Sequence, residues 1–205
     1  MKKFFKIVIW PFKWLFKRIV RFGIWLYCKV IFRAKIVGKR NIPRKGALVV
    51  CGNHESFLDP AIITATMPRD IRFLVKKELW RFKFLAFMGK VFEEIPVSRD
   101  ERDIATVKIV LKALKNDECI GIFPEGTRKG MEKGADVKNG AAFFALRSGA
   151  KVLPAWISKI EKKNRFMFKR VTLKYGEPLD FSSYGKDDVE KVTEEIMSAI
   201  LKLEE

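Results

Sequence analysis

Acidic residues are absent from the first quarter of this chain, and histidine occurs only once. The 205 residues include 42 Lys and Arg but 24 Asp and Glu, which gives a formal net charge of +18, and no acidic residue precedes Glu55. Residues 1–54 contain 14 of the basic residues, which leaves 28 basic against 24 acidic residues in 55–205. The positive excess therefore belongs to the N-terminal quarter.

Cysteine and long uncharged runs are also scarce. The three cysteines, Cys28, Cys51 and Cys119, are odd in number and widely spaced, so they make neither a disulfide framework nor a zinc set. Two of them fall in apolar runs and are expected to be small buried residues, consistent with a reducing compartment. The longest uncharged stretch of the apolar N-terminal segment (residues 1–33), residues 22–28, is far shorter than the roughly 18 residues that span a bilayer. A secretory signal is not expected either, because lysines interrupt the apolar region.

The N-terminal segment, residues 1–33, is nevertheless the most apolar and aromatic part of the chain. On a helix, Lys6, Lys13, Lys17 and Arg21 fall within about 80° of one another, and the rest of the circumference is apolar. This pattern predicts an anchor that lies in one leaflet, with the basic stripe on anionic headgroups and Trp10, Trp14 and Trp25 at the boundary. Pro11 and Gly23 make two helical pieces as plausible as one. The alternative is a helix packed on the core with solvated lysines.

Past residue 33, short apolar runs alternate with helical patterns. Strands are predicted near residues 34–38, 47–51, 71–75, 91–97, 119–123, 152–157 and 170–175. Helices are predicted near residues 57–66, 78–88, 102–116, 139–148 and 187–203. This alternation indicates a single α/β domain over residues 34–205, with a mixed, largely parallel sheet flanked by helices.

The only histidine, His54, follows one of these predicted strands and lies five residues before Asp59. An imidazole suits proton transfer near neutral pH, and a nearby carboxylate fixes its tautomer, so the pair is a candidate acid/base centre. Ser56 and Asp59 have the form of a capping box, which places a helix start at about Ser56. Alternatively, Asp59 caps a helix whose first residue is Pro60. The plainer interpretation is a surface turn with Asp59 merely capping the helix.

A second polar cluster, residues 124–130, follows the predicted strand that starts at Cys119. Gly126 allows close backbone approach, and Arg128 supplies a planar fork that matches phosphate oxygens. The cluster is therefore a candidate anion site, although a charged surface turn would have the same composition.

Together, the two clusters resemble a known family. Asn53-His54 with Asp59, followed by Phe123-Pro124-Glu125-Gly126-Thr127-Arg128, closely resemble the first and third motifs of the glycerolipid acyltransferases, specifically the bacterial 1-acyl-glycerol-3-phosphate acyltransferases. Landmarks between and after them match in order: Lys76-Lys77-Glu78-Leu79, Ile95-Pro96-Val97-Ser98-Arg99 and Val152-Leu153-Pro154-Ala155. The second motif usually ends in Asp-Arg, whereas this chain has Ser98-Arg99.

The resemblance implies roles for particular residues. His54 and Asp59 would be catalytic, and the residues for the acceptor and its phosphate would be Lys76, Arg99, Glu125, Gly126, Thr127 and Arg128. The implied reaction moves a fatty acyl group from acyl carrier protein or coenzyme A to the free hydroxyl of a lysophosphatidate, giving phosphatidic acid. No metal or other cofactor is expected. The implied location is the cytoplasmic face of the cell membrane, as a monotopic protein in contact with anionic lipids.

Three other functions compete with this one. The acceptor could instead be glycerol 3-phosphate, a lysophospholipid or a lyso-aminolipid. A sequence pI near 9.9 is also typical of nucleic-acid binding, but the basic residues are interleaved with a wide apolar face and no recognised binding motif is found. A membrane-tethered scaffold without activity is disfavoured by the intact motifs. No Ser or Cys lies in a nucleophile elbow, which favours direct transfer over an acyl-enzyme.

Overall fold

A computed structural model describes residues 2–98, 104–126, 137–160 and 170–205, with side chains from residue 12 onward. Seven strands form one sheet in the order β1-β7-β6-β2-β5-β3-β4. Every strand pair in this part of the chain is parallel except β6 with β7. The predicted mixed, largely parallel sheet is therefore confirmed.

The strands lie close to the predicted positions. Their bounds are β1 Lys35–Val37, β2 Leu48–Gly52, β3 Arg72–Lys76, β4 Ile95–Val97, β5 Cys119–Ile122, β6 Lys151–Ile157 and β7 Thr172–Tyr175. The central strand β2 is buried along its whole length. Such a strand is covered on both faces, which explains why its sequence is a continuous apolar run.

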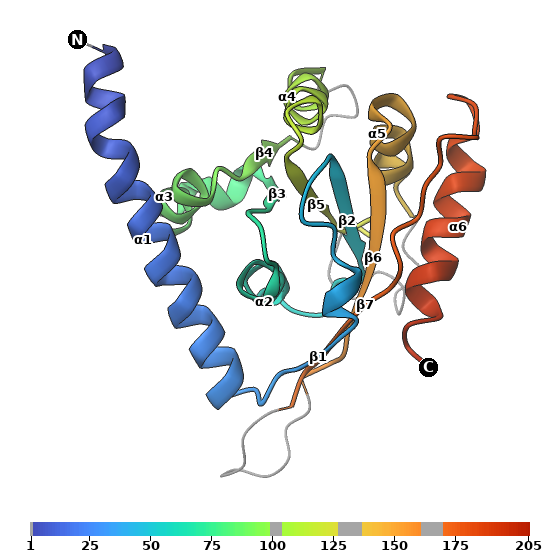
Figure 1. The fold of residues 1–205 in the computed structure, drawn as a ribbon, viewed down its shortest axis with the longest axis horizontal. Coiled ribbons are helices and arrows are strands. Elements are labelled where there is room, and N and C mark those ends of the chain that lie inside the picture. Colours follow the sequence, from blue (N-terminus) through green and yellow to red (C-terminus); the bar gives the residue numbers. More distant parts are fainter. Residues whose placement is uncertain (1, 99–103, 127–136, 161–169) are drawn as a thin grey trace.

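Helices cover both faces of the sheet (Figure 1). The helices and turns are α1 Lys2–Val30, η1 Lys39–Asn41, α2 Asp59–Thr66, η2 Lys77–Arg81, α3 Lys83–Phe92, α4 Ile104–Lys115, α5 Gly140–Ser148 and α6 Val189–Leu201. One core cluster joins the sheet to α2 and to the end of α1, and the other joins it to α4, α5 and α6. Cys28, Cys51 and Cys119 are free and buried in these clusters, as the sequence predicted for two of them.

Three local predictions differ from the structure. Helix α2 begins at Asp59, with Leu58 as its N-cap residue, so neither a start at Ser56 nor a cap at Asp59 is correct. The predicted strand 91–97 is half helix, because α3 continues to Phe92 and ends at Glu93 in a left-handed conformation. The predicted helix 78–88 is divided into the 3-10 turn η2 and α3.

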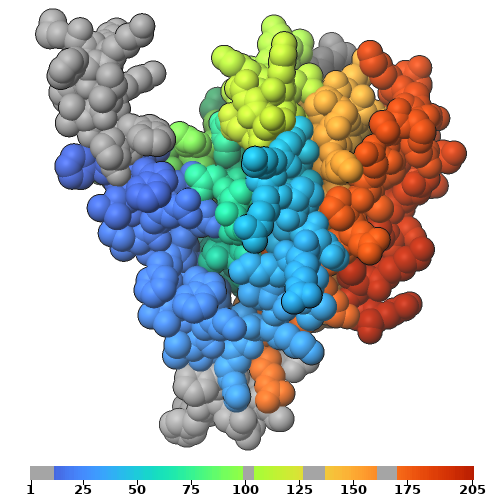
Figure 2. All heavy atoms as spheres, viewed as in Figure 1, coloured from blue at the N-terminus to red at the C-terminus, as the bar shows by residue number. Residues whose placement is uncertain are grey.

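Helix α1 runs unbroken through Pro11 and Gly23 along one edge of the molecule, where Figure 2 shows it as a ridge. Its C-terminal end belongs to the domain core, since Cys28 and the following Phe32 are buried there. Within the described residues, no helix combines the length and apolar character needed to cross a bilayer.

The described part of the basic stripe of α1, Lys13, Lys17 and Arg21, faces the domain, whereas the sequence predicted that it contacts lipid headgroups. Lys17 and Arg21 are nearly fully buried and both bind Asp70, at 2.8 and 2.7 Å. Arg21 also donates to the carbonyl of Met67 at the end of α2. Lys13 pairs with Glu93 at 2.7 Å. Carboxylates of the domain therefore take the place predicted for anionic lipid, and Lys6 and Trp10 lie outside the described side chains.

The apolar face of α1 points the other way, into solvent. Its exposed members are Phe12, Leu15, Phe16, Ile19, Phe22, Leu26, Tyr27 and Val30. Trp14 is exposed beside the stripe, under Arg18, whereas Trp25 is half-buried and stacks on Phe22 with ring centroids 5.8 Å apart. A continuous exposed apolar face of this size is typical of a surface that contacts a membrane or another protein.

Candidate active site

The carboxyl end of β2 brings His54 and Asp59 together, as the sequence predicted. The chain leaves β2 at Gly52 and returns as helix α2, whose first residue is Asp59. Nδ1 of His54 lies 2.9 Å from Oδ2 of Asp59, and because a carboxylate can only accept, Nδ1 carries the proton. Nε2 is then left unprotonated on the neutral ring. The imidazole keeps 17% of its side-chain surface exposed, whereas the carboxylate keeps 1%.

Asp59 is itself held in position by the backbone of the connecting loop. The N–H groups of Glu55 and Ser56 both donate to Oδ2, each at 2.7 Å. The short polar loop therefore folds around the carboxylate before the helix begins. This arrangement fixes the atom that orients the imidazole.

Glu125 and Asn53 tie the loop to the neighbouring strands. Oε1 of the buried Glu125 accepts a hydrogen bond from the backbone N–H of His54 at 3.2 Å, which joins the two sequence motifs. Asn53 donates to the carbonyl of Ile157 at 2.9 Å and accepts from its N–H at 2.7 Å, so it continues the β2–β6 pairing with a side chain. Sequence reasoning assigned no role to Asn53. It placed Glu125 with the acceptor, and the structure adds that Glu125 positions the backbone of His54.

Two phenylalanine rings, stacked one behind the other, support the face of the imidazole. Phe123 stacks on His54 with centroids 4.3 Å apart, and Phe73 stacks on Phe123 with centroids 5.4 Å apart. Gly121 makes room for Phe73, because a Cβ at that position would lie 2.3 Å from the ring. Sequence reasoning missed this stack. The only available signal was a glycine inside a buried strand, which often marks a close approach by another group.

Gly126 adopts a left-handed conformation with φ of 59°, so the tight turn after β5 favours glycine. Its N–H donates to the carbonyl of Phe123 at 3.0 Å. The N–H of Ser56 is engaged as well, by Asp59, so neither of these two N–H groups is free to stabilise an oxyanion.

Lys76 ends β3 at the same edge of the sheet. The register of β3 with β5 ends at Phe73 opposite Gly121, and Lys76 lies three residues further along, at the carboxyl end of β3. Lys76 is exposed, so its ammonium group is accessible to a phosphate group of a ligand. Arg99, Thr127 and Arg128 lie outside the described residues.

Cys51 is the thiol nearest to His54 along the chain, and it is fully buried. Burial, and after it the negative charge of Glu125, raises the pKa of this thiol far above its usual range. A thiol that stays protonated is a poor nucleophile. The site therefore offers a base, His54, but no activated nucleophile among the described residues.

The known proteins that resemble this chain are acyltransferases. A model of the Acyltransferase family matches residues 33–158. A 1-acyl-sn-glycerol-3-phosphate acyltransferase of Bacillus subtilis is 28% identical, and the match covers 83% of this chain and 87% of that protein. The protein of the same name from Borreliella burgdorferi is 30% identical over 85% of this chain and 68% of its own length. The crystal structure of the 1-acyl-sn-glycerophosphate (LPA) acyltransferase PlsC from Thermotoga maritima has a TM-score of 0.74 at 21% identity, covering 98% of this chain and 91% of that chain. That likeness supports the fold.

Proposed function

This chain belongs to the Acyltransferase family, and on that premise we propose that it transfers a fatty acyl group from a thioester to the free hydroxyl of 1-acyl-glycerol 3-phosphate, giving phosphatidic acid. It is an enzyme of the acyltransferase class. The observation that carries the proposal is the His54–Asp59 pair at the carboxyl end of β2, joined by Glu125 to the third motif. Acyl carrier protein and coenzyme A both remain candidate donors.

His54 acts as the general base. Attack by a secondary hydroxyl on a thioester carbonyl needs a group that removes the proton as the C–O bond forms, and the unprotonated Nε2 can do this. Proton transfer of this kind contributes roughly 10²- to 10⁴-fold to the rate. Asp59 holds Nδ1–H and stabilises the imidazolium that develops. The proton then passes to the departing thiolate, so the acyl group moves directly between the two substrates.

Lys76, Arg99 and Arg128 bind the phosphate of the acceptor, with Thr127 beside Arg128. The exposed position of Lys76 at the carboxyl end of β3 supports this proposal, because His54 follows the carboxyl end of β2 in the same sheet. A phosphate fixed beside the base places the acceptor hydroxyl for attack, and such positioning contributes several kcal/mol to lowering a barrier.

The protein docks on the cytoplasmic face of the cell membrane as a monotopic protein, through the apolar face of α1. The exposed aromatic and aliphatic side chains of that face support this proposal. The lipid acceptor then reaches the site from the leaflet without being fully extracted from it. The buried Lys17 and Arg21 do not take part in this contact and instead attach α1 to the domain.

The first test is turnover by the full chain. We expect wild-type protein to convert lysophosphatidate in vesicles to phosphatidic acid with acyl carrier protein or coenzyme A thioester, detected by mass spectrometry. His54→Ala should lose at least 10²-fold in rate while its vesicle binding is unchanged, because only the base is removed. Full activity of His54→Ala would contradict the assignment of the base.

Competing acceptors complete the test. Glycerol 3-phosphate, a lysophospholipid and a lyso-aminolipid are offered together with lysophosphatidate, and the products are compared. We expect acylated lysophosphatidate to dominate. A preference for another acceptor would retain the acyl-transfer mechanism but overturn the proposed substrate.

A further inference from the structure

The segment η2–α3, residues 77–92, carries three phenylalanines that the fold leaves uncovered. Phe82, Phe84 and Phe87 are 48%, 71% and 52% exposed. Phe84 and Phe87 lie three residues apart on α3 and therefore share one face of the helix. Large aromatic side chains gathered on a surface in this way mark a contact with a partner or a membrane.

The face of α3 away from Phe84 and Phe87 is packed on the molecule at Gly89, and the C-terminal end of the helix is buried at Val91 and Phe92. Trp80 of η2 packs against Gly89 of α3, where an added Cβ would lie 3.1 Å from the indole ring. The segment therefore has a fixed inner face and a free outer face, and the outer phenylalanines are held in place by the fold.

The charge of the segment is complementary to an anionic surface. Residues 77–92 include four basic residues and one acidic residue, Glu78. Lys77, Lys83 and Lys90 are exposed, and no basic residue of the segment forms an ion pair within the described part of the chain. Unpaired cations around exposed aromatic rings are typical of surfaces that enter the headgroup region of anionic lipid.

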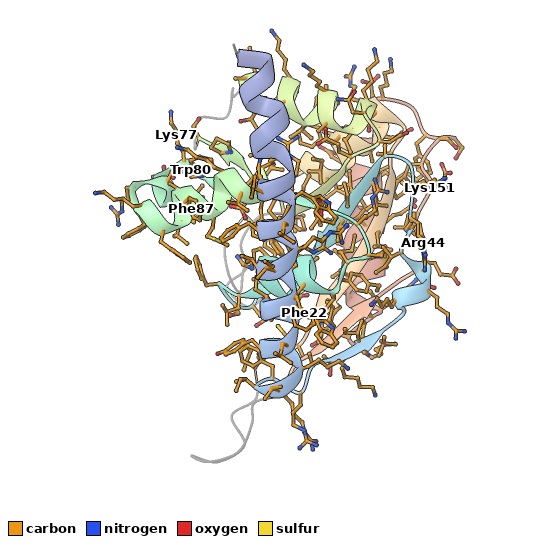
Figure 3. All side chains as sticks on the ribbon, turned by 60° about the vertical axis from the view of Figure 1, so that its left-hand side comes forward. Phe22, Arg44, Lys77, Trp80, Phe87 and Lys151 are labelled. Carbon is orange, nitrogen blue, oxygen red and sulfur yellow. The ribbon has the colours of Figure 1, made fainter. Side chains whose placement is uncertain are left out.

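The outer face of α3 continues the apolar face of α1. The rings of Phe16 and Phe87 meet edge to face with centroids 5.8 Å apart. Figure 3 shows Lys77, Trp80 and Phe87 on the projecting η2–α3 segment, beside α1, which carries Phe22. The exposed apolar side chains of the two helices thus form one surface, with cations of the segment along it.

We propose that η2–α3 is a second lipid-inserting element, which docks together with α1 on a leaflet that contains anionic lipid. This inference rests on the proposed function, because it concerns how that enzyme meets its lipid substrate. A single helix lying in an interface can roll about its own axis, whereas two contacts in different directions fix the orientation of the domain. Segment η2 begins directly after Lys76, so its insertion turns the sheet edge that holds His54 toward the headgroups.

The test uses a fluorophore at a single position of the full chain. The native cysteines are buried, so an environment-sensitive dye attaches selectively to Phe84→Cys. We expect its emission to shift to the blue and to rise when vesicles of phosphatidylcholine and phosphatidylglycerol are added. The matched control is Leu201→Cys on α6, which is 46% exposed and lies on the far side of the molecule from α1 (Figure 1). Its emission should not change.

Vesicle sedimentation gives an independent readout. The double variant Phe84→Ser with Phe87→Ser should partition to these vesicles at least tenfold more weakly than wild type, since two aromatic rings leave the lipid. Leu201→Ser should stay within twofold of wild type. The thermal midpoint of each variant shows whether a change in partition reflects unfolding.

The inference would be overturned if the emission of the dye on Phe84→Cys stayed unshifted when the protein binds vesicles. A wild-type dimer, seen by analytical ultracentrifugation, that the double variant dissociates would overturn it too, because the surface would then bind a second copy. Neither readout involves turnover. Acyl transfer with an unshifted dye leaves the proposed function intact, and a shifted dye without acyl transfer leaves the docking surface intact.

Discussion

At the scale of single residues, the site depends on contacts that hold the imidazole of His54 in one orientation. Its Nδ1 is bound by Asp59, its backbone N–H by Glu125, and its ring face by Phe123. The contacts come from α2 and from the segment that follows β5, so the imidazole at the end of β2 is oriented where these parts of the chain meet. Such preorganisation is what a general base requires, since a small misplacement of the base is costly in rate.

Asp59→Asn tests the orienting carboxylate. An amide can still accept the backbone hydrogen bonds of Glu55 and Ser56 through its oxygen, but it no longer stabilises an imidazolium at Nδ1. We expect kcat for acyl transfer to fall by about 10²- to 10⁴-fold, with a smaller change in KM. The control is Asp180→Asn, an exposed carboxylate paired with Lys151, which should keep wild-type rates. A near-normal kcat for Asp59→Asn would mean that Asp59 only caps the loop.

Glu94, beside the end of α3, gives the protein a pH-dependent stability. Burial raises the pKa of its carboxyl to about 7, from 4.5 in the unfolded chain. The folded state therefore holds this proton more tightly, and stability falls as pH rises from 4.5 to 7. Above pH 7 the loss reaches about 3 kcal/mol.

Glu94→Gln should remove that loss. Its melting temperature should exceed that of wild type at pH 8, and the difference should vanish below pH 4.5, where Glu94 is protonated in both states. Glu93→Gln is the matched control. Burial tends to raise the pKa of Glu93, but Lys13 and other cations outweigh burial and lower it, so this variant should be slightly less stable than wild type at pH 8. Thermal unfolding across pH checks both.

At the scale of elements, Asp70 attaches α1 to the domain. Burial alone would raise the pKa of Asp70, but Lys17 and Arg21 outweigh burial and hold it below its usual range. Both cations are nearly fully buried, and so they need this counter-charge. The carboxylate therefore fixes the helix that bears the apolar face against α2, whose first residue is Asp59.

Asp70→Asn should loosen this attachment. Leaving two buried cations without their carboxylate costs several kcal/mol in a dry interior, but Asp70 is half exposed, so we expect a loss of about 1–2 kcal/mol in the free energy of unfolding. Amide hydrogen exchange should accelerate in α1 before it does in β2 or β5. Equal acceleration throughout the chain would show that α1 is not separately attached.

The sequence predicted most elements because hydrophobic period and turn residues are local signals. It placed β2, β5 and β6 within a residue or two, and it paired His54 with Asp59. It did not predict which way the basic stripe of α1 faces, because the partners Asp70 and Glu93 lie about 50 to 80 residues away and pairing over such distances leaves no local pattern. The stack of Phe73 on Phe123 was missed for the same reason, since β3 and β5 meet only in the folded sheet.

At the scale of the whole molecule, the reversed stripe changes how membrane binding should respond to mutation. Removal of residues 2–30 would also remove Lys17, Arg21 and the core residue Cys28, so a deletion would disturb the fold together with the docking surface. Substitutions on the outer face of α1 separate the two effects. Ile19 and Phe22 are 60% and 63% exposed, so their side chains contribute little to the packing of α1 on the domain.

Ile19→Ser with Phe22→Ser should therefore weaken partition of the full chain to anionic vesicles by tenfold or more, with little change in thermal stability. Lys13→Gln breaks only an exposed ion pair with Glu93 and should leave partition nearly unchanged, because this lysine faces the domain. Sedimentation at increasing salt adds a second measurement. Screening weakens contacts between cations and headgroups but spares apolar burial, so partition that survives high salt in wild type and is lost in the double variant identifies the apolar face of α1 as the main contact.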